Sequence, residues 1–409
     1  MKTLGIIGAG ASGLFLAANI ERNPNLKILV FEKTHEALKK VLISGGGRCN
    51  VTHQYLQPSK FPTNYPRGEK WMQKHLKQFS PLDTQKWFEQ KGVALKTERD
   101  GRMFPETNTS STIANTILSE ATKKGAEILY QTEIINIQII DNQFELTTNH
   151  QQKYIVDFLV GASGGPQKKQ SLSLWNQLQI KNVDPVPSLF TFKTTDKKVT
   201  EFMGLSVPYA KIKIEKTKLE YHGPLLITHW GFSGPAILKL SAFGASYLAE
   251  NEYHFNVQIQ WDQALNENAA KEWLEMNLNI KSKSLLVNKN PNPIPKRLWQ
   301  FLIEKSEISL DKRICDLSKK DCHRLIENLI HCRFEIRGKT TYKEEFVTAG
   351  GIDLSVLNTA NFESIEIKNL FFIGEILNID GITGGFNFQN AWTSAWIVAQ
   401  EINNRIKTS

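Results

Sequence analysis

The chain has 409 residues, of which 41% are hydrophobic and 22% charged, so a disordered chain is excluded and two or three domains with a well-buried core are expected. Four cysteines are too few for a disulfide scaffold, and no apolar run is long enough to span a bilayer. We therefore expect a cytoplasmic protein without a membrane partner, whose net charge of +9 serves either a polyanionic partner or solubility alone.

The first 32 residues have the pattern of a βαβ unit. Apolar strands are expected over Lys2–Ile7 and Lys27–Phe31, with a helix over Ser12–Glu21 between them. Residues 8–13 read GAGASG, a GxGxxG motif, whose glycines allow a tight turn, close approach of a pyrophosphate and close packing of helix on strand. Glu32 follows about 20 residues later, where a carboxylate accepts both hydroxyls of an adenosine ribose. The unit predicts a dinucleotide site that includes Gly8, Gly10, Ser12, Gly13 and Glu32.

A glycine-rich loop, SGGGRCN at residues 44–50, precedes a longer mixed region. Helical patterns occur near Gly68–Gln90 and Ile113–Lys123, and an apolar strand is expected over Tyr154–Val160, which runs into GASGG at residues 161–165. Alternating segments predict further strands at 127–131, 133–139 and 144–148.

The character of the chain changes between about residues 183 and 341. Short strands such as Ala210–Ile214 and His254–Trp261 occur there, with helices near 268–278, 296–303 and 319–330, as expected for an insertion. A buried strand over Asn369–Ile373 and a helix over Phe386–Ile406 then restore the α/β pattern. The cofactor domain is therefore expected to form from both ends of the chain, with the nucleotide motif at one end and a strand and helix at the other. This arrangement favours FAD, because a plain NAD dehydrogenase does not need it.

Four segments resemble the YhiN/BaiN-like flavoprotein family, a group of NAD(P)/FAD-dependent, aminoacetone-oxidase-like oxidoreductases. They are GAGASG at 8–13, LISGGGRCNVT at 42–52, LLITHWGFSGP at 225–235, and GEILNIDG with GGFNFQ within 374–389. The resemblance covers nearly the whole chain. It implies an α/β fold in which a discontinuous FAD-binding Rossmann-like domain carries an inserted β-barrel and a small helical subdomain. We assign residues 1–187 and 342–409 to the first, 188–262 and 331–341 to the second, and 263–330 to the third.

The candidate cofactor residues gather in the glycine-rich segments. Three glycines beside Arg48 predict a backbone nest near the pyrophosphate or the flavin. Glu375 and Asp380 are expected to reach the ribityl hydroxyls, and the helix after Gly385 to place N–H groups near the flavin pyrimidine. Residues 167–171, QKKQS, replace the Gly/Thr-rich stretch usual in the family, so expectations about the substrate pocket do not carry over there. Beyond the dinucleotide motif and Glu32, the set comprises Lys33, Lys40, Ser44, Gly45, Gly46, Gly47, Arg48, Asn50, Ile134, Ala162, Ser163, Gly164, Gly374, Glu375, Asp380, Gly381, Gly384, Gly385, Phe386 and Asn387.

Two residues are candidates for catalysis, each with a plainer alternative. Cys49 is either a proton donor to substrate or a small buried residue. His229 either acts on substrate or is a structural histidine. The spacing of Cys315, Cys322, His323, His331 and Cys332 fits no common zinc pattern, so no metal is expected.

The insertion is rich in cations, and this favours a polyanionic substrate. The resemblance implies reduction of an activated C=C bond, either in rRNA uracil or in steroid enones. The favoured function is hydride transfer from reduced FAD to uridine in ribosomal RNA. NADPH or NADH is the expected electron donor. A small-molecule enone reductase or amine oxidase, and a non-catalytic redox-sensing or RNA-binding flavoprotein, remain alternatives. The cations are Lys211, Lys213, Lys216, Lys218, Lys281, Lys283, Lys289, Lys296, Arg297, Lys312, Arg313, Lys319, Lys320 and Arg324.

Overall fold

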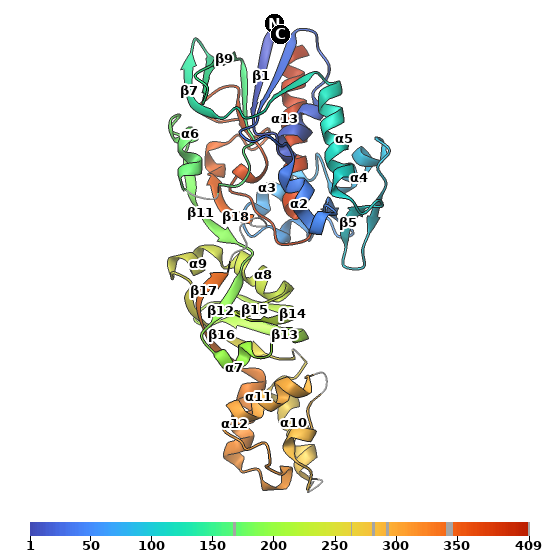
Figure 1. The fold of residues 1–409 in the computed structure, drawn as a ribbon, viewed down its shortest axis with the longest axis vertical. Coiled ribbons are helices and arrows are strands. Elements are labelled where there is room, and N and C mark those ends of the chain that lie inside the picture. Colours follow the sequence, from blue (N-terminus) through green and yellow to red (C-terminus); the bar gives the residue numbers. More distant parts are fainter. Residues whose placement is uncertain (167–168, 263, 280–282, 292–293, 341–346, 408–409) are drawn as a thin grey trace. The chain divides into compact units, whose positions relative to one another are not determined.

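The computed structural model describes residues 1–409 apart from 167–168, 263, 280–282, 292–293, 341–346 and 408–409. The chain divides into two compact units (Figure 1). The first unit comprises Met1–Pro187 and Val347–Ser409, and the second comprises Ser188–Phe346. In the described part of the chain, no helix is both long and apolar enough to cross a membrane.

A five-stranded parallel sheet forms the centre of the first unit, and its order is β19-β10-β1-β2-β6. Its strands are short and mostly buried, as expected for a parallel sheet with both faces covered. The helices α1, α5 and α13 pack on one another beside the sheet (Figure 1). The bounds are β1 (Lys2–Ile7), β2 (Leu26–Phe31), β6 (Ala126–Leu129), β10 (Phe158–Gly161), β19 (Leu370–Phe372), α1 (Ala11–Asn19), α5 (Ser110–Lys123) and α13 (Phe386–Lys407).

The strand expected over Tyr154–Val160 is two strands, which corrects the prediction. β9 (Lys153–Val156) pairs antiparallel with β8, whereas β10 pairs parallel with β1. Asp157 separates them, and its carboxylate accepts the Thr3 N–H at 2.7 Å and the Gln143 amide at 2.9 Å. This one side chain therefore links the parallel sheet to the antiparallel sheet of β7 (Ile134–Ile140), β8 (Gln143–Thr148) and β9.

Smaller elements complete the first unit. The helical pattern near Gly68–Gln90 is two helices, and the second begins at a capping box formed by Ser80 and Asp83. The short helix α2 runs into the glycine-rich segment, and Ser44, Gly45 and Gly46 at this end leave the helical conformation. The remaining bounds are α2 (Lys39–Gly47), α3 (Glu69–His75), α4 (Pro81–Glu89), α6 (Ser173–Asn176), β3 (Thr52–His53), β4 (Leu95–Thr97), β5 (Arg102–Pro105), β11 (Asn182–Ser188) and β18 (Val347–Ile352).

The second unit contains a closed six-stranded barrel and a group of helices that share one hydrophobic core. The barrel order is β12-β15-β14-β13-β16-β17. This confirms the expected α/β architecture with an inserted barrel and helices; the exact three-domain boundaries remain a prediction. The bounds are β12 (Thr191–Thr194), α7 (Lys197–Thr200), β13 (Ser206–Ile214), β14 (Glu220–Thr228), β15 (Gly231–Ser233), α8 (Pro235–Phe243), α9 (Ala245–Glu250), β16 (His254–Gln260), α10 (Glu267–Asn279), α11 (Lys296–Lys305), α12 (Lys319–Ile330) and β17 (Cys332–Thr340).

Candidate functional site

The glycine motif forms an open cradle at the N-terminus of α1. Gly8 has φ +112°, and a Cβ there would lie 2.4 Å from the Ala162 carbonyl oxygen; a Cβ on Gly13 would lie 2.0 Å from the Gly8 oxygen. A Cβ on Gly10 would meet nothing within 4 Å, and no side chain caps the helix start. Gly8 and Gly13 are thus needed for packing, whereas Gly10 keeps space open before uncapped N–H groups, which suits a phosphate.

Glu32 lies beside this cradle at the end of β2. One carboxylate oxygen accepts the Ala9 N–H at 3.0 Å, and the other accepts the Thr34 N–H and hydroxyl, both at 2.8 Å. These bonds fix the half-buried carboxylate next to the glycine turn. An acid held at this place fits the adenosine ribose of a dinucleotide.

The three consecutive glycines of the SGGGRCN segment form an exposed turn. Gly45, Gly46 and Gly47 have φ of 58°, 66° and 79°, and a Cβ on Gly46 or Gly47 would meet nothing within 4 Å. Such consecutive left-handed residues aim backbone N–H groups toward one side and can bind an anion. The Arg48 guanidinium is directed elsewhere: it pairs with Glu98 at 2.6 Å, and its Cζ lies 4.1 Å from the centre of the Phe104 ring.

Cys49 is fully buried, with an exposed fraction of 0%. Burial raises the pKa of its thiol to about 12, against a smaller opposite effect from a hydrogen bond with Ser44. Its backbone is left-handed, with φ +59°. The thiol has no accessible surface for a substrate, so the geometry supports the packing alternative over the proton-donor alternative.

The segment after β19 lies against the first turn of α1. Gly374 has φ +75°, and a Cβ there would lie 2.4 Å from the Ser12 hydroxyl oxygen. The Gly374 N–H donates to the Ser394 hydroxyl at 2.9 Å, and its carbonyl accepts the Asn390 amide at 3.2 Å. Glu375 next to it pairs with Lys40 at 2.7 Å. Residues from both ends of the chain therefore meet beside the cradle.

The segment that leads into α13 is held by side chains. Asp380 is fully buried and its carboxylate is paired with Arg67; its expected contact with the ribityl chain remains a prediction. Asn387 closes the turn, since its side chain accepts the Gly381 N–H at 2.8 Å and donates to the Gly381 carbonyl at 2.9 Å. At Gly385, φ is +91° and a Cβ would lie 2.7 Å from Thr52 backbone atoms, so the helix start lies directly against the SGGGRCNVT segment.

Several residues join these two segments, and of these only Asn50 was among the predicted site residues. His53 lies with Nδ1 3.1 Å from the Gly384 carbonyl oxygen, and its ring stacks on Phe386 at 4.9 Å. Gln389 is fully buried and accepts the Thr52 hydroxyl at 2.6 Å. In the amide orientation that its neighbours favour, Asn50 accepts the Gly385 N–H at 3.0 Å. The sequence did give signals for the others: Thr52 and Gln389 fall within the segments LISGGGRCNVT and GGFNFQ, and His53 follows the first of these segments.

The other candidate residues are distributed around the cradle or away from it. Ala162 is buried beside Gly8, whereas Ser163 is exposed and Gly164 has φ +78° with open space where a Cβ would be. Ile134 is buried at the start of β7, and Lys33 is exposed after Glu32. His229 belongs to the second unit, where it is exposed between β14 and β15 with its ring 3.8 Å from that of Trp230. Among the residues that the structure describes, no three His, Cys, Asp or Glu side chains are grouped to hold a metal.

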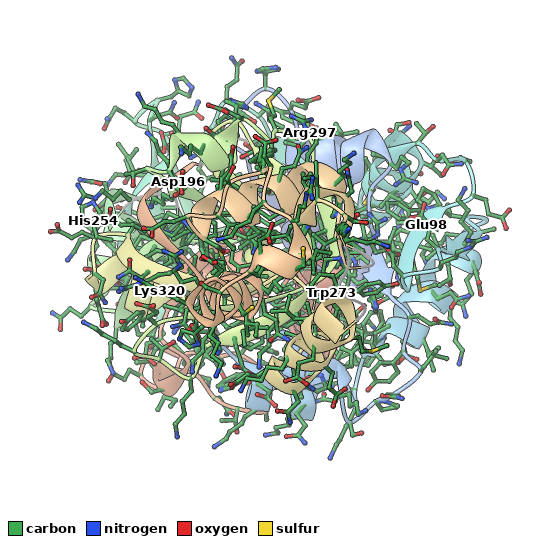
Figure 2. The ribbon with its side chains drawn as sticks, turned by 90° about the horizontal axis from the view of Figure 1, so that it is seen from below. Glu98, Asp196, His254, Trp273, Arg297 and Lys320 are labelled. Carbon is green, nitrogen blue, oxygen red and sulfur yellow. The ribbon has the colours of Figure 1, made fainter. Side chains whose placement is uncertain are left out.

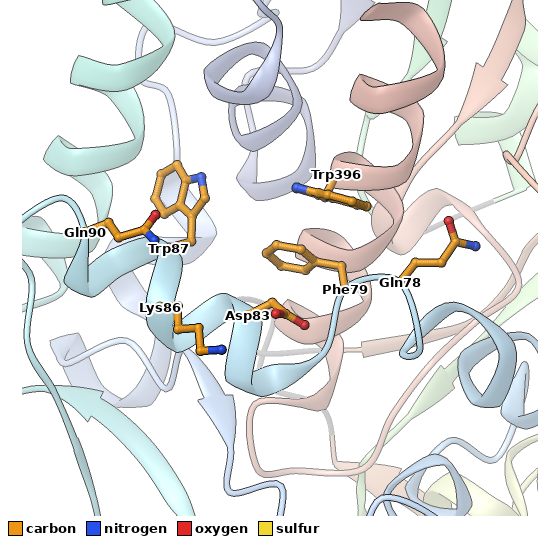
Figure 3. Close-up of a pocket in the computed structure, with 7 residues that line it drawn as sticks. All are labelled: Gln78, Phe79, Asp83, Lys86, Trp87, Gln90 and Trp396. Carbon is orange, nitrogen blue, oxygen red and sulfur yellow. The ribbon is translucent and has the colours of Figure 1, made fainter. Parts of the chain in front are cut away.

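A separate hollow of about 220 Å³ lies on the first unit between α4 and α13 (Figure 3). The rings of Phe79 and Trp396 stack there at 5.3 Å. None of the residues that line it belongs to the candidate cofactor set, so it is distinct from the cradle. They are Gln78, Phe79, Asp83, Lys86, Trp87, Gln90 and Trp396.

The parallel sheet, the open glycine cradle and the adjacent acid define a dinucleotide-binding protein of the Rossmann type. Residues 2–401 match the family described as HI0933-like protein Rossmann domain, and the chain belongs to this family. It is a flavin-dependent oxidoreductase, and the cradle with Glu32 fits FAD.

Three relatives match over nearly their whole length. The chain is 29% identical to a ribosomal RNA dihydrouridine synthase of Haemophilus influenzae, covering 98% of both chains. It is 27% identical to the protein of the same name from Escherichia coli, covering 97% of both. It is 22% identical to a 3-dehydro-bile acid delta(4,6)-reductase of Clostridium scindens, covering 99% of this chain and 100% of the other.

Proposed function

We propose that this protein reduces an activated C=C bond, and that its substrate is uridine in ribosomal RNA, which becomes dihydrouridine. The observation that carries the proposal is the full-length match to two relatives named for this activity, at 29% and 27% identity against 22% for the bile acid reductase. Once bound and reduced by the electron donor, the flavin would supply a hydride from its N5 atom to one carbon of the bond, and a proton would be added to the other carbon. NADPH or NADH is the proposed electron donor, and the cytoplasm the proposed location.

The residues of the first unit hold the cofactor in this proposal. Gly10 leaves room for the pyrophosphate in front of α1, and Glu32 binds the adenosine ribose. The turn of Gly45–Gly47 adds backbone N–H groups. The N-terminus of α13 supplies further N–H groups and favours negative charge in front of it. We assign Arg48 and Asp380 a positioning role, since each is engaged with a protein side chain.

The second unit supplies the contact with RNA in this proposal. Residues 188–346 hold 24 lysines and arginines against 19 aspartates and glutamates, so the arrangement of the cations matters more than their excess. Three of the predicted cations make ion pairs. Lys211 pairs with Glu220 at 2.9 Å, Lys312 pairs with Asp321 at 2.7 Å, and Arg324 pairs with Asp321 and Glu307. Lys281 lies outside the described residues.

The deciding experiment maps dihydrouridine in ribosomal RNA from cells that lack the protein. We expect one or more dihydrouridine positions to disappear and to return with the wild-type protein but not with Gly10→Val, which removes the phosphate space. An unchanged map in the deleted strain would reject RNA as the substrate.

A small-molecule enone reductase is the second candidate, and the match to the bile acid reductase over the full chain favours it. The two candidates differ in what reoxidises the reduced protein under anaerobic conditions. Fast reoxidation by a steroid enone, together with none by uridine-containing ribosomal RNA, would make the small-molecule reductase the better description. The reverse result supports the RNA substrate.

A further inference from the structure

The outer face of the barrel in the second unit presents a row of basic and polar side chains. Lys211 of β13 lies opposite His222 of β14, and Lys213 lies opposite Gln258 of β16. Gln258 in turn lies opposite Arg333 of β17. Side chains alternate along a strand, and the intervening β13 residues Ala210, Ile212 and Ile214 belong to the buried core. The register therefore places the cations of β13 and β17 on the outer face, with His222 of β14 and Gln258 of β16 beside them.

Five cations gather on this part of the barrel face, and two of them pair with acids; further along β17, Glu335 pairs with Arg337. Lys213 is exposed and makes no ion pair with the described residues, and the same holds for Lys216 and Lys218 in the turn that joins β13 to β14. Lys211 pairs with Glu220 at 2.9 Å and Arg333 with Glu215 at 2.8 Å. The Lys211 and Arg333 side chains are 37% and 62% exposed, and ion pairs between such exposed side chains contribute little to stability. Both cations can therefore exchange their acidic partner for a phosphate. The face is thus net positive and complementary to phosphate.

An aromatic side chain is exposed on the same strand. The pairing of β13 with β14 shifts between Val207 and Ala210, and Tyr209 at this bulge is 54% exposed. Tyr209 precedes Lys211 by two residues, so both lie on the outer face, and His222 opposite Lys211 is also exposed. Exposed rings next to cations on a sheet are the means by which single-stranded RNA is bound without a groove.

Some cations of the helical part are paired with acids or lie far from one another. Lys312 and Arg324 are engaged by acidic side chains. Arg297 of α11 and Lys320 of α12 lie well apart in the end-on view of the molecule (Figure 2). Charge complementarity in a continuous row therefore favours the barrel face.

We infer that the basic wall, defined as Lys211, Lys213, Lys216, Lys218 and Arg333 with Tyr209, holds a single-stranded segment of the RNA substrate. The lysines and Arg333 contact phosphates, and Tyr209 stacks on a base. This inference rests on the proposed function, since it names where the RNA binds.

The test compares two variants of equal charge in the full-length, FAD-loaded protein. The wall variant carries Lys213→Thr, Lys216→Asn and Lys218→Ser; the control variant carries Lys283→Ser, Lys296→Ser and Lys319→Ser, all exposed positions on the same unit. Binding of a labelled single-stranded fragment of ribosomal RNA is measured over a range of salt concentrations. Each lost phosphate contact lowers the slope of log K against log salt by about 0.7, so the wall variant loses about 2 and the control retains its slope.

A second pair of variants tests the stacking. Tyr209→Ser is expected to weaken binding by about tenfold without a change of salt slope, whereas Tyr209→Phe retains affinity. If both triple variants lose the same amount of slope, or if only the control loses slope, the basic wall is not the RNA-binding surface. The proposal that RNA is the substrate is not affected by that result. Absence of salt-dependent RNA binding by the wild-type protein would instead reject the proposed function itself.

Discussion

The carboxylate of Asp380 pairs with the guanidinium of Arg67, and the backbones of the two residues form an isolated antiparallel bridge. Asp380 is fully buried, and the Arg67 side chain is 17% exposed. The packing around the pair is close, because a Cβ on Gly68 would lie 2.6 Å from the Ile379 side chain. The pair fastens the segment before α13 to the segment before α3.

Replacing Arg67 with Met is expected to destabilise the protein by about 3–5 kcal/mol, because a buried carboxylate loses its counter-charge. Urea unfolding of the wild type and the variant measures the difference. The double variant Arg67→Met with Asp380→Asn removes the stranded charge and should recover part of the loss. A single variant within about 0.5 kcal/mol of the wild type would show that the pair is not needed.

Gly10→Val and Gly13→Val should both impair the protein, the first by preventing flavin binding and the second by lowering its stability. A Cβ at Gly10 would meet no protein atom within 4 Å, so this variant is expected to purify without flavin and to melt at the temperature of the flavin-free wild type. A side chain at Gly13 would meet the Gly8 carbonyl oxygen at 2.0 Å, so this variant is expected to lose stability itself. Flavin absorbance per protein and the melting temperature separate the two effects.

The wild-type protein supplies the reference for this comparison. It should be yellow and should release FAD on denaturation, because the cradle and Glu32 suit an adenine dinucleotide. Release of FMN alone, or unchanged flavin content in Gly10→Val, would contradict the assignment of the cradle.

The sequence was a good guide to the fold where hydrophobic periodicity is strong. The helix expected over Phe386–Ile406 is observed as α13, at Phe386–Lys407, and helices and strands of the insertion were found near their expected positions. The boundary between β9 and β10 within the apolar run Tyr154–Val160 was not predicted. It depends on hydrogen bonds that the Asp157 carboxylate accepts from Thr3 and Gln143. Such tertiary bonds leave no periodic signal.

The site was predictable in its backbone and less so in its side chains. The glycines at 8, 10 and 13 have the local geometry that the motif implies. The partners of Arg48 and Asp380 lie 50 and 313 residues away in sequence, at Glu98 and Arg67. A single sequence carries no information about such pairs, so neither partner was predicted.

The two fully buried thiols should make the protein sensitive to alkali. Burial raises the pKa of Cys49 and of Cys332 from 9.0 to about 12. Below pH 9 both states keep the protons; as pH rises from 9 toward 12 only the unfolded state releases them, so stability is lost over this window. The slope should be about 1.4 kcal/mol per pH unit for each thiol.

Urea unfolding over that pH window measures the slope. The matched variant with Cys49→Ala and Cys332→Ala should show a clearly shallower decline, although its stability at neutral pH is lower because two buried side chains are truncated. An identical alkaline slope in the variant would mean that other groups control the loss.

Cys49→Ala should leave turnover within about tenfold of the wild type, because loss of a general acid typically costs 10²-fold or more and this buried, neutral thiol has no access to substrate. Single-turnover reoxidation of the reduced, FAD-loaded protein by its substrate measures the step directly. Cys49→Gly is the matched control, since φ +59° at this position suits glycine and should relieve backbone strain without restoring a thiol. If both variants keep FAD and fold normally but reoxidise about 100-fold more slowly, Cys49 is a proton donor after all, and the loop must open during turnover to expose it.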